Sequence, residues 1–139
     1  EDTIEGVYVC QGVSPSGPYE GVVEVWKHGD NTYVLRWTIG DRVRRGVGIT
    51  NGDTLAASFP GLARLGDRTL VIVTIVLYKI EAGSRLTGEW ATSIPNGVSP
   101  VFPETLTKLP GTRPEPEEEL EEPLPPEQPT PPVRPNKIA

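Results

Sequence analysis

The sequence contains no methionine, one cysteine and one histidine among its 139 residues. The lone Cys10 excludes an intrachain disulfide, and we expect it to be a small buried hydrophobic side chain. One cysteine and one histidine do not supply the usual ligands of a transition-metal site, so neither a metal nor another cofactor is expected. The lack of methionine indicates that a segment before Glu1 has been removed. A cleaved secretory signal is the commonest explanation, although a trimmed chain would look the same, and we expect an extracytoplasmic protein, periplasmic or secreted.

Aromatic residues are also missing from residues 110–139, which contain ten prolines and seven glutamates. Such a composition cannot build a core, so we expect a folded domain over 1–109 and an extended or polyproline-II tail over 110–139. The domain carries 10 basic and 12 acidic residues and the tail carries 3 and 7, so most of the net charge of −6 lies in the tail. This balance argues against nucleic acid or an anionic membrane as the main partner. No apolar stretch reaches the ~20 residues that a membrane-spanning helix needs.

The clearest pattern is a hairpin in which residues 20–27 and 32–39 form antiparallel strands around a four-residue turn. Alternation in the second strand places four apolar side chains on one face: Tyr33, Leu35, Trp37 and Ile39. We expect this face to form a wall of the core. In the first strand two pairs compete for the inward face: Val23 with Val25, and Val22 with Trp26.

Six further strands are predicted, at residues 4–10, 42–50, 53–59, 69–80, 85–92 and 101–109. Residues 11–18 and 60–67 are predicted loops, and Asn51-Gly52 predicts a type I′ turn, whose two central residues both need positive φ. Eight short strands without an amphipathic helix indicate an all-β fold. An antiparallel up-and-down barrel is the most economical arrangement because it removes both exposed edges, and a two-sheet β-sandwich is the alternative. Glycines inside the strands fit the strong coiling of a small barrel.

Glycine and aromatic positions follow a recognisable order through residues 4–109: Gly6-x-Tyr8, Tyr19-x-Gly21-x-Val23, Tyr33-x-x-x-Trp37, Gly46-x-Gly48-Ile49, Gly52-Asp53-x-Leu55 and Leu86-Thr87-Gly88-x-Trp90. This order resembles a family of small exported bacterial domains, some of them labelled fibronectin-binding. The resemblance implies an extracytoplasmic all-β domain and does not imply an enzyme.

A second resemblance concerns one strand. Leu86-Thr87-Gly88-Glu89-Trp90 is similar to the Leu-Thr-Gly-x-Trp motif of avidin-type barrels. In those proteins the motif opens the barrel, whereas here it lies in the penultimate predicted strand, and no set of biotin-contacting residues carries over. The similarity implies barrel packing around a tryptophan.

Two charged residues interrupt apolar faces. Arg45 shares a side with Val43, Val47 and Ile49, and Glu104 shares a side with Phe102 and Leu106. One interpretation places both charges inside the barrel or at one mouth, where an isolated charge is costly without a partner or a polar ligand. The other places each in water at a bulge or at the rim. If the barrel is hollow, the first interpretation predicts a cavity lined by Tyr33, Trp37, Arg45, Trp90 and Glu104.

The predicted strand 69–80 is apolar on both faces, with Leu70, Ile72, Val76 and Tyr78 opposite Val71, Val73, Ile75 and Leu77. One face fills the core, and the other would meet solvent in a lone barrel. We assign the first set, Leu70, Ile72, Val76 and Tyr78, to an interface with a protein partner or a second copy, in which the 110–139 tail also takes part. A covering loop or a docked tail is the alternative.

The sequence predicts no catalytic residue. His28 lies in the turn of the first hairpin without a nucleophile in its motif, and we expect it to be exposed. The first functional hypothesis is therefore a non-enzymatic protein-interaction barrel, an accessory or structural subunit of a larger bacterial assembly. The second is a small-ligand-binding barrel of the calycin or avidin type. An interior filled by large side chains would favour the first hypothesis, and an open cavity with inward polar groups would favour the second.

Overall fold

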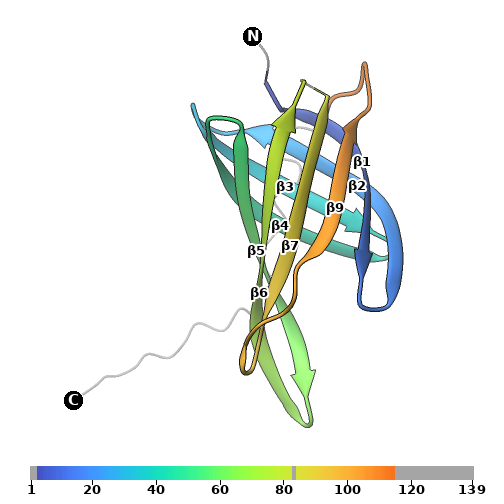
Figure 1. Cartoon of the computed structure of the whole chain (residues 1–139), viewed down its shortest axis with the longest axis vertical. Coiled ribbons are helices and arrows are strands. Elements are labelled where there is room, and N and C mark those ends of the chain that lie inside the picture. Colours follow the sequence, from blue (N-terminus) through green and yellow to red (C-terminus); the bar gives the residue numbers. More distant parts are fainter. Residues whose placement is uncertain (1–2, 83, 115–139) are drawn as a thin grey trace, which may run out of the picture.

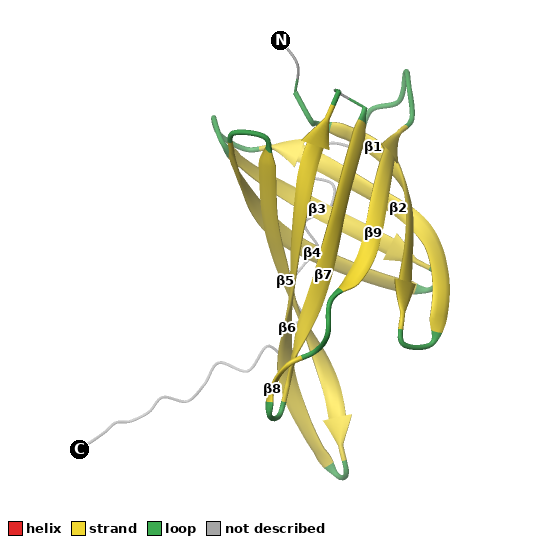
Figure 2. Cartoon of the chain, viewed as in Figure 1, coloured by secondary structure: helices red, strands yellow, loops and turns green. Residues whose placement is uncertain are grey.

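The computed structural model describes residues 3–82 and 84–114, which contain nine β-strands and no helix (Figure 2). No helix long and apolar enough to cross a membrane occurs within this described part. The strands are β1 (Gly6–Ser14), β2 (Gly17–Lys27), β3 (Thr32–Ile39), β4 (Arg42–Asn51), β5 (Thr54–Leu65), β6 (Arg68–Glu81), β7 (Arg85–Ile94), β8 (Gly97–Val98) and β9 (Phe102–Lys108).

The strands close into an antiparallel barrel (Figure 1). Consecutive strands from β1 to β7 are paired with one another. Strand β7 also pairs with β9, and β9 pairs with β1, which closes the ring. The two-residue β8 pairs only with the end of β7 and adds a ninth strand outside the eight-membered ring. The up-and-down barrel is confirmed, and the sandwich alternative is wrong, because every ring strand has two hydrogen-bonded neighbours and the ring closes between β9 and β1.

The hairpin β2–β3 forms part of the core wall. Leu35 and Trp37 on β3 are almost completely buried, and Val23 and Val25 on β2 face the same interior, which resolves the ambiguity of that strand. Outside the wall, Trp26 pairs with Val34 in a separate small buried cluster. The guanidinium of Arg36 lies 5.9 Å above the Trp26 ring.

Several predicted boundaries differ from the structure. The predicted loop 11–18 is wrong. Strand β1 extends to Ser14 and β2 begins at Gly17, so only a tight turn separates the two strands. The predicted loop 60–67 is also wrong: β5 and β6 continue as a paired ribbon through Pro60 to Leu65 and Arg68. Gly52 has a positive φ of 65° but Asn51 does not, which excludes the type I′ turn centred on Asn51-Gly52.

Strand β4 faces the interior with the side opposite to its valines. Gly46 and Gly48 are buried, whereas Val47 and Arg45 point outward and are exposed. The interior placement of Arg45 is therefore wrong. The apolar side of this strand faces outward because the wall coils so tightly at Gly46 that a Cβ atom there would overlap the carbonyl oxygen of Ser58 on β5.

Strand β6 also reverses part of the prediction. Val76 and Tyr78 are buried in the barrel interior, so they are wrong as interface residues. Leu70 and Ile72 are half-buried on the same face, in the projecting ribbon of β5 and β6. The side chains exposed on the outside are those of the opposite set: Val71, Val73, Ile75 and Leu77.

The two ends of the barrel differ. One end is closed by packed core side chains, among which Tyr8 donates a hydrogen bond to the carbonyl oxygen of Ile4 at 2.7 Å. The other end carries the β1–β2 and β3–β4 turns and the projecting β5–β6 ribbon (Figure 1). The predicted domain boundary at Pro110 lies just after β9, and the predicted tail beyond residue 114 lies outside the described residues.

Candidate functional site

A cavity of about 430 Å³ opens at the end of the barrel that carries the β1–β2 and β3–β4 turns. All eight ring strands and two of the adjoining turns contribute to its lining, which consists of Ser14, Ser16, Tyr19, Trp37, Ile39, Asp41, Arg42, Arg44, Phe59, Gly61, Ile72, Thr74, Val76, Trp90, Thr92 and Glu104. We call this cavity the cup. Ligand pockets in proteins commonly measure about 300–1,000 Å³, so the cup is large enough for a small organic molecule.

Glu104 lies at the base of the cup with an exposed fraction of only 4%. Its Oε1 accepts a hydrogen bond from the Tyr19 hydroxyl at 2.5 Å, and its Oε2 accepts one from Tyr78 and a longer one from Trp37 Nε1 at 3.3 Å. Trp37 Nε1 also donates to the Tyr78 hydroxyl at 3.1 Å. The buried carboxylate is therefore held by three donors from β2, β3 and β6, which offset the cost of removing it from water.

Aromatic rings form much of the wall of the cup. The ring centroids of Trp37 and Phe59 are 4.7 Å apart with an interplanar angle of 47°. Those of Trp90 and Phe102 are 4.9 Å apart at 34°. Strand pairing brings these partners together: Trp90 is opposite Phe102 in the β7–β9 register.

Trp90 also carries the buried polar atom that stands out in the cup. Its Nε1 is buried, and no acceptor in the described part of the chain meets it at good hydrogen-bond geometry, although Trp90 interacts with the Tyr19 hydroxyl and acts to lower the pKa of that phenol. A buried donor without an acceptor costs about 1–3 kcal/mol of folding free energy. An acceptor atom that enters the cup and accepts a hydrogen bond from the indole N–H would remove this cost.

The mouth of the cup carries charge of both signs. Arg42 and Arg44 lie on the interior side of β4, and Asp41 lies in the preceding turn. Neither arginine forms an ion pair with a residue of the ranges 3–82 and 84–114. Guanidinium groups at this position can bind an anionic or acceptor group of a ligand.

Burial shifts the pKa values of the groups around Glu104. Desolvation, and secondarily the negative charge of Glu104, raises the pKa of Tyr78 and of Tyr19 well above the usual 10.0. The same two causes raise the pKa of the Cys10 thiol well above 9.0. Desolvation, followed by the neighbouring Tyr33, raises the pKa of Tyr8 to about 12. Cys10 is free and completely buried, as expected for a small core side chain.

These shifts predict that the barrel unfolds in alkaline solution. The unfolded chain releases the protons of these four groups above pH 9 to 10, whereas the folded chain retains them, so stability is complete below their ordinary pKa values and falls as the pH rises. Each group contributes a slope of about 1.4 kcal/mol per pH unit, and a typical stability of about 5–15 kcal/mol is then exhausted near pH 11 to 12. Circular dichroism together with tyrosinate absorbance across pH 8 to 12 measures the effect.

The matched variant for this experiment is Tyr19→Phe, which removes one titrating hydroxyl and keeps the ring. Its slope above pH 10 should be smaller than that of the wild type by about 1.4 kcal/mol per pH unit. Gradual ionisation of tyrosine at pH 10, without cooperative unfolding at higher pH, would contradict the prediction.

No group of three or more histidine, cysteine, aspartate or glutamate side chains able to hold a metal occurs in the described part. His28 is exposed in the turn between β2 and β3, at the closed end and away from the cup. The hydrogen-bond partners of Glu104 are two phenols and an indole, from Tyr19, Tyr78 and Trp37.

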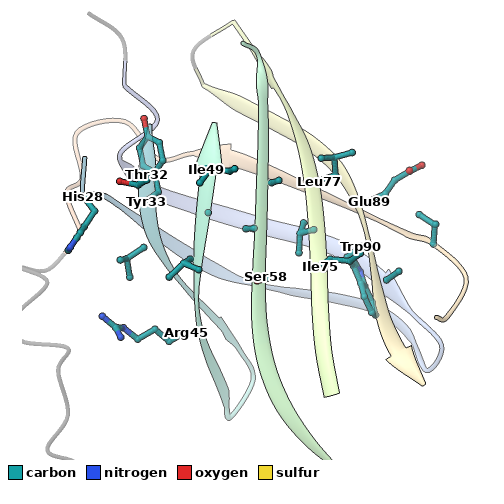
Figure 3. A pocket seen from close by; sticks show the side chains of 18 residues that line it. His28, Thr32, Tyr33, Arg45, Ile49, Ser58, Ile75, Leu77, Glu89 and Trp90 are labelled. Atoms are coloured by element: carbon teal, nitrogen blue, oxygen red, sulfur yellow. The ribbon is translucent and has the colours of Figure 1, made fainter. Parts of the chain in front are cut away.

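A second depression, of about 1160 Å³, lies on the outer surface across β3 to β7 (Figure 3). Five of its lining side chains are apolar and more than half exposed: Val47, Ile49, Ile75, Leu77 and Val101. Arg45 and Glu89 lie at opposite edges of this depression. We call it the outer groove.

The structure brings together three of the five side chains predicted for a cavity: Trp37, Trp90 and Glu104 line the cup. Tyr33 is buried deeper toward the closed end, and Arg45 lies on the outer groove. Sequence reasoning missed Arg42, Arg44, Tyr19 and Phe59. The alternation of β4 places the two arginines on the same face of the strand as Gly46 and Gly48, which is the interior face. The valines on the opposite face made that face look like the interior one.

No protein-family model and no curated protein matches this chain. Two solved structures are similar in fold. EF1p2_mFAP2b bound to DFHBI has a TM-score of 0.55 and 15% sequence identity, with 76% of this chain and 94% of that chain covered. A redesigned β-barrel, mFAP0, bound to DFHBI, has a TM-score of 0.51 and 17% identity, with coverage of 76% and 98%.

These similarities establish the fold alone, because both identities are low. They agree with the barrel that the avidin-type motif implied. They do not show the exported bacterial family labelled fibronectin-binding, and that resemblance stays a prediction.

Proposed function

We propose that this protein is a non-enzymatic small-molecule-binding barrel that holds its ligand in the cup. The observation that carries the proposal is the hollow open end, where aromatic walls enclose a buried carboxylate and the Nε1 donor of Trp90. An open cavity with inward polar groups is the result that favours a ligand-binding barrel over a filled structural one.

The similar structures give independent support. Both EF1p2_mFAP2b and mFAP0 are β-barrels bound to a small molecule, DFHBI. We further propose that the protein acts outside the cytoplasm, as the resemblance of residues 4–109 to small exported domains implies.

Titration of the 15N-labelled full chain with DFHBI and with a panel of small aromatic compounds tests the proposal by NMR. Binding in the cup should shift the amide signals of Gly61, Thr74 and Thr92, and leave those of Ile49 and Leu77 on the outer groove unchanged. Native mass spectrometry of the protein from its own source should show an added mass. The proposal fails if no compound shifts the cup signals and no added mass is found, or if the shifts lie in the outer groove.

Gly61→Phe provides a blocking variant. Gly61 lines the cup, and a Cβ atom there would meet its neighbours only at ordinary contact distances of 3.6–3.8 Å, so the backbone tolerates a side chain while the ring occupies the mouth. The variant should fold and lose binding. A folded variant that binds as tightly as the wild type would contradict the assignment to the cup.

The outer groove supports a second function, association of two copies of the chain. Association would bury its exposed apolar side chains. Arg45 and Glu89 lie at its two edges and carry opposite charges, so a two-fold axis through the groove would bring each next to its opposite on the other copy (Figure 3). In such a dimer Arg45 of one copy would face Glu89 of the other. We infer that this face, and not the set containing Val76 and Tyr78, would form the interface.

Light scattering after size-exclusion chromatography tests the second function. The wild type should have twice the monomer mass, Ile75→Lys should be monomeric, and Val13→Lys, on an exposed site of β1 outside the groove, should remain dimeric. A wild type that is monomeric at concentrations up to about 100 µM would exclude this function.

A further inference from the structure

The mouth of the cup presents cationic donors toward its interior. Arg44 Nε would lie 3.7 Å from a Cβ atom at Gly61 on the neighbouring strand, so its side chain runs across the mouth along the inner face. Among the described residues, the hydrogen bond found for this guanidinium is a long one, from Nη1 to the carbonyl oxygen of Val43 at 3.4 Å. Most of its donors are therefore directed to solvent or to an incoming group.

The interior of the cup adds a second donor. Trp90 Nε1 is buried, and no acceptor within residues 3–82 and 84–114 meets it at good hydrogen-bond geometry; the Tyr19 hydroxyl is the nearby group with which it interacts. The arginines at the rim can donate hydrogen bonds to bulk water. The buried Trp90 N–H can do so only if water enters the cup. A ligand that places an acceptor atom beside Trp90 would remove the cost of the unpaired N–H.

The acidic groups do not offer an equivalent site for a cation. Both oxygens of Glu104 already accept hydrogen bonds, from Tyr19, Tyr78 and Trp37. Asp41 lies at the rim, where Arg42 and Arg44 outnumber it. The mouth therefore carries a net positive charge, and the donors offered to a ligand are the arginines and the Trp90 N–H.

The walls restrict the shape of the ligand. Four of the lining side chains, those of Trp37, Phe59, Trp90 and Tyr19, are flat aromatic rings, and stacking on such rings favours a planar aromatic body. We propose that the cup binds a planar aromatic molecule carrying an anionic group, with the anion at Arg44, an acceptor atom at Trp90 and the ring system between the aromatic walls.

This ligand class rests on the proposed function, and one matched series tests both. Isothermal titration calorimetry of the full chain would compare naphthalene-2-carboxylate, the neutral naphthalene-2-carboxamide and the cationic 2-naphthylmethylammonium. We expect the carboxylate to bind with one-to-one stoichiometry and about tenfold more tightly than the carboxamide, because its contact with Arg44 is charge-assisted. The ammonium compound should bind most weakly, and added salt should reduce the preference for the carboxylate.

Three variants locate the contacts. Arg44→Gln should weaken binding of the carboxylate about tenfold and abolish its advantage over the carboxamide. Trp90→Phe keeps a ring and removes the N–H, and should weaken both compounds severalfold. Arg45→Gln is the matched control, since the neighbouring residue points to the outer surface, and it should bind like the wild type.

The outcomes separate the two levels of the proposal. Equal affinity for carboxylate and carboxamide, tighter binding of the ammonium compound, or an Arg44→Gln variant that retains the preference would overturn the anionic ligand class and leave the cup as a binding site. Absence of binding by all three compounds, together with unchanged cup signals in the NMR titration with DFHBI, would overturn the proposed function as well.

Discussion

Replacing Glu104 by alanine is expected to lower the free energy of unfolding by about 3–5 kcal/mol. The substitution removes the acceptor of the Tyr19 and Tyr78 hydroxyls and one of the two acceptors of Trp37 Nε1. These donors lie on three different strands, so the loss affects the wall of the barrel as well as the cup. Urea denaturation followed by circular dichroism measures the change.

Glu104→Gln separates the charge from the hydrogen bonds. It retains the shape and one acceptor oxygen, and should cost about 1–3 kcal/mol, less than the alanine variant. Glu20→Ala, on the exposed face of β2 and outside both the cup and the outer groove, is the control and should change stability by less than about 0.5 kcal/mol. Arg45→Ala should combine additively with Glu104→Ala because the two residues lie on opposite faces of the wall. A Glu104→Ala variant as stable as the Glu20→Ala control would show that the buried carboxylate is not structural.

Gly46→Ala is expected to destabilise the barrel by about 3 kcal/mol or more. A Cβ atom at this position overlaps the carbonyl oxygen of Ser58 and lies 2.9 Å from Cβ of Phe59. The obstacle is the backbone of the neighbouring strand, which cannot rotate away as the end of a long side chain can. The strands β4 and β5 would have to separate, which disturbs the aromatic pair of Phe59 and Trp37 in the cup.

Gly61→Ala is the matched control on the adjacent strand. Its Cβ atom would have no neighbour closer than 3.6 Å, and its φ lies outside the positive range. The substitution should be neutral or stabilise the fold by about 0.4–1 kcal/mol, through the reduced entropy of the unfolded chain. Thermal unfolding of both variants decides the matter, and an equal effect of the two substitutions would contradict the tight coiling assigned to Gly46.

The sequence indicated the strands reliably where alternation was strict. Strand β3 was predicted with its observed bounds, because Tyr33, Leu35, Trp37 and Ile39 alternate with polar or outward residues over its whole length. The loop predictions at 11–18 and 60–67 were wrong because Pro18 and Pro60 are turn or edge signals, yet both prolines lie within long paired strands. The short strand β8 has no periodic signal at all.

The candidate site was harder to predict than the fold. Period-two alternation assigns two faces to a strand but does not say which of them is inside, and on β4 and β6 both faces looked apolar or mixed. Burial of Val76 and Tyr78, and exposure of Val47 and Ile75, follow from the coiling and closure of the wall. Glu104 was identified because a lone charge on a face with Phe102 and Leu106 is conspicuous in any register.

The sequence by itself determined an all-β fold of short antiparallel strands and favoured a barrel over a two-sheet sandwich, because a closed barrel buries the apolar faces and pairs the edges with short turns and in-strand glycines. Only the tertiary structure decided that one end is hollow, that Glu104 binds three donors there and that Arg44 rather than Arg45 reaches the mouth. The physical reason is that a cavity and its charges depend on the stagger and coiling of strands distant in the chain, such as β2, β6 and β9, and these are set by how the barrel closes.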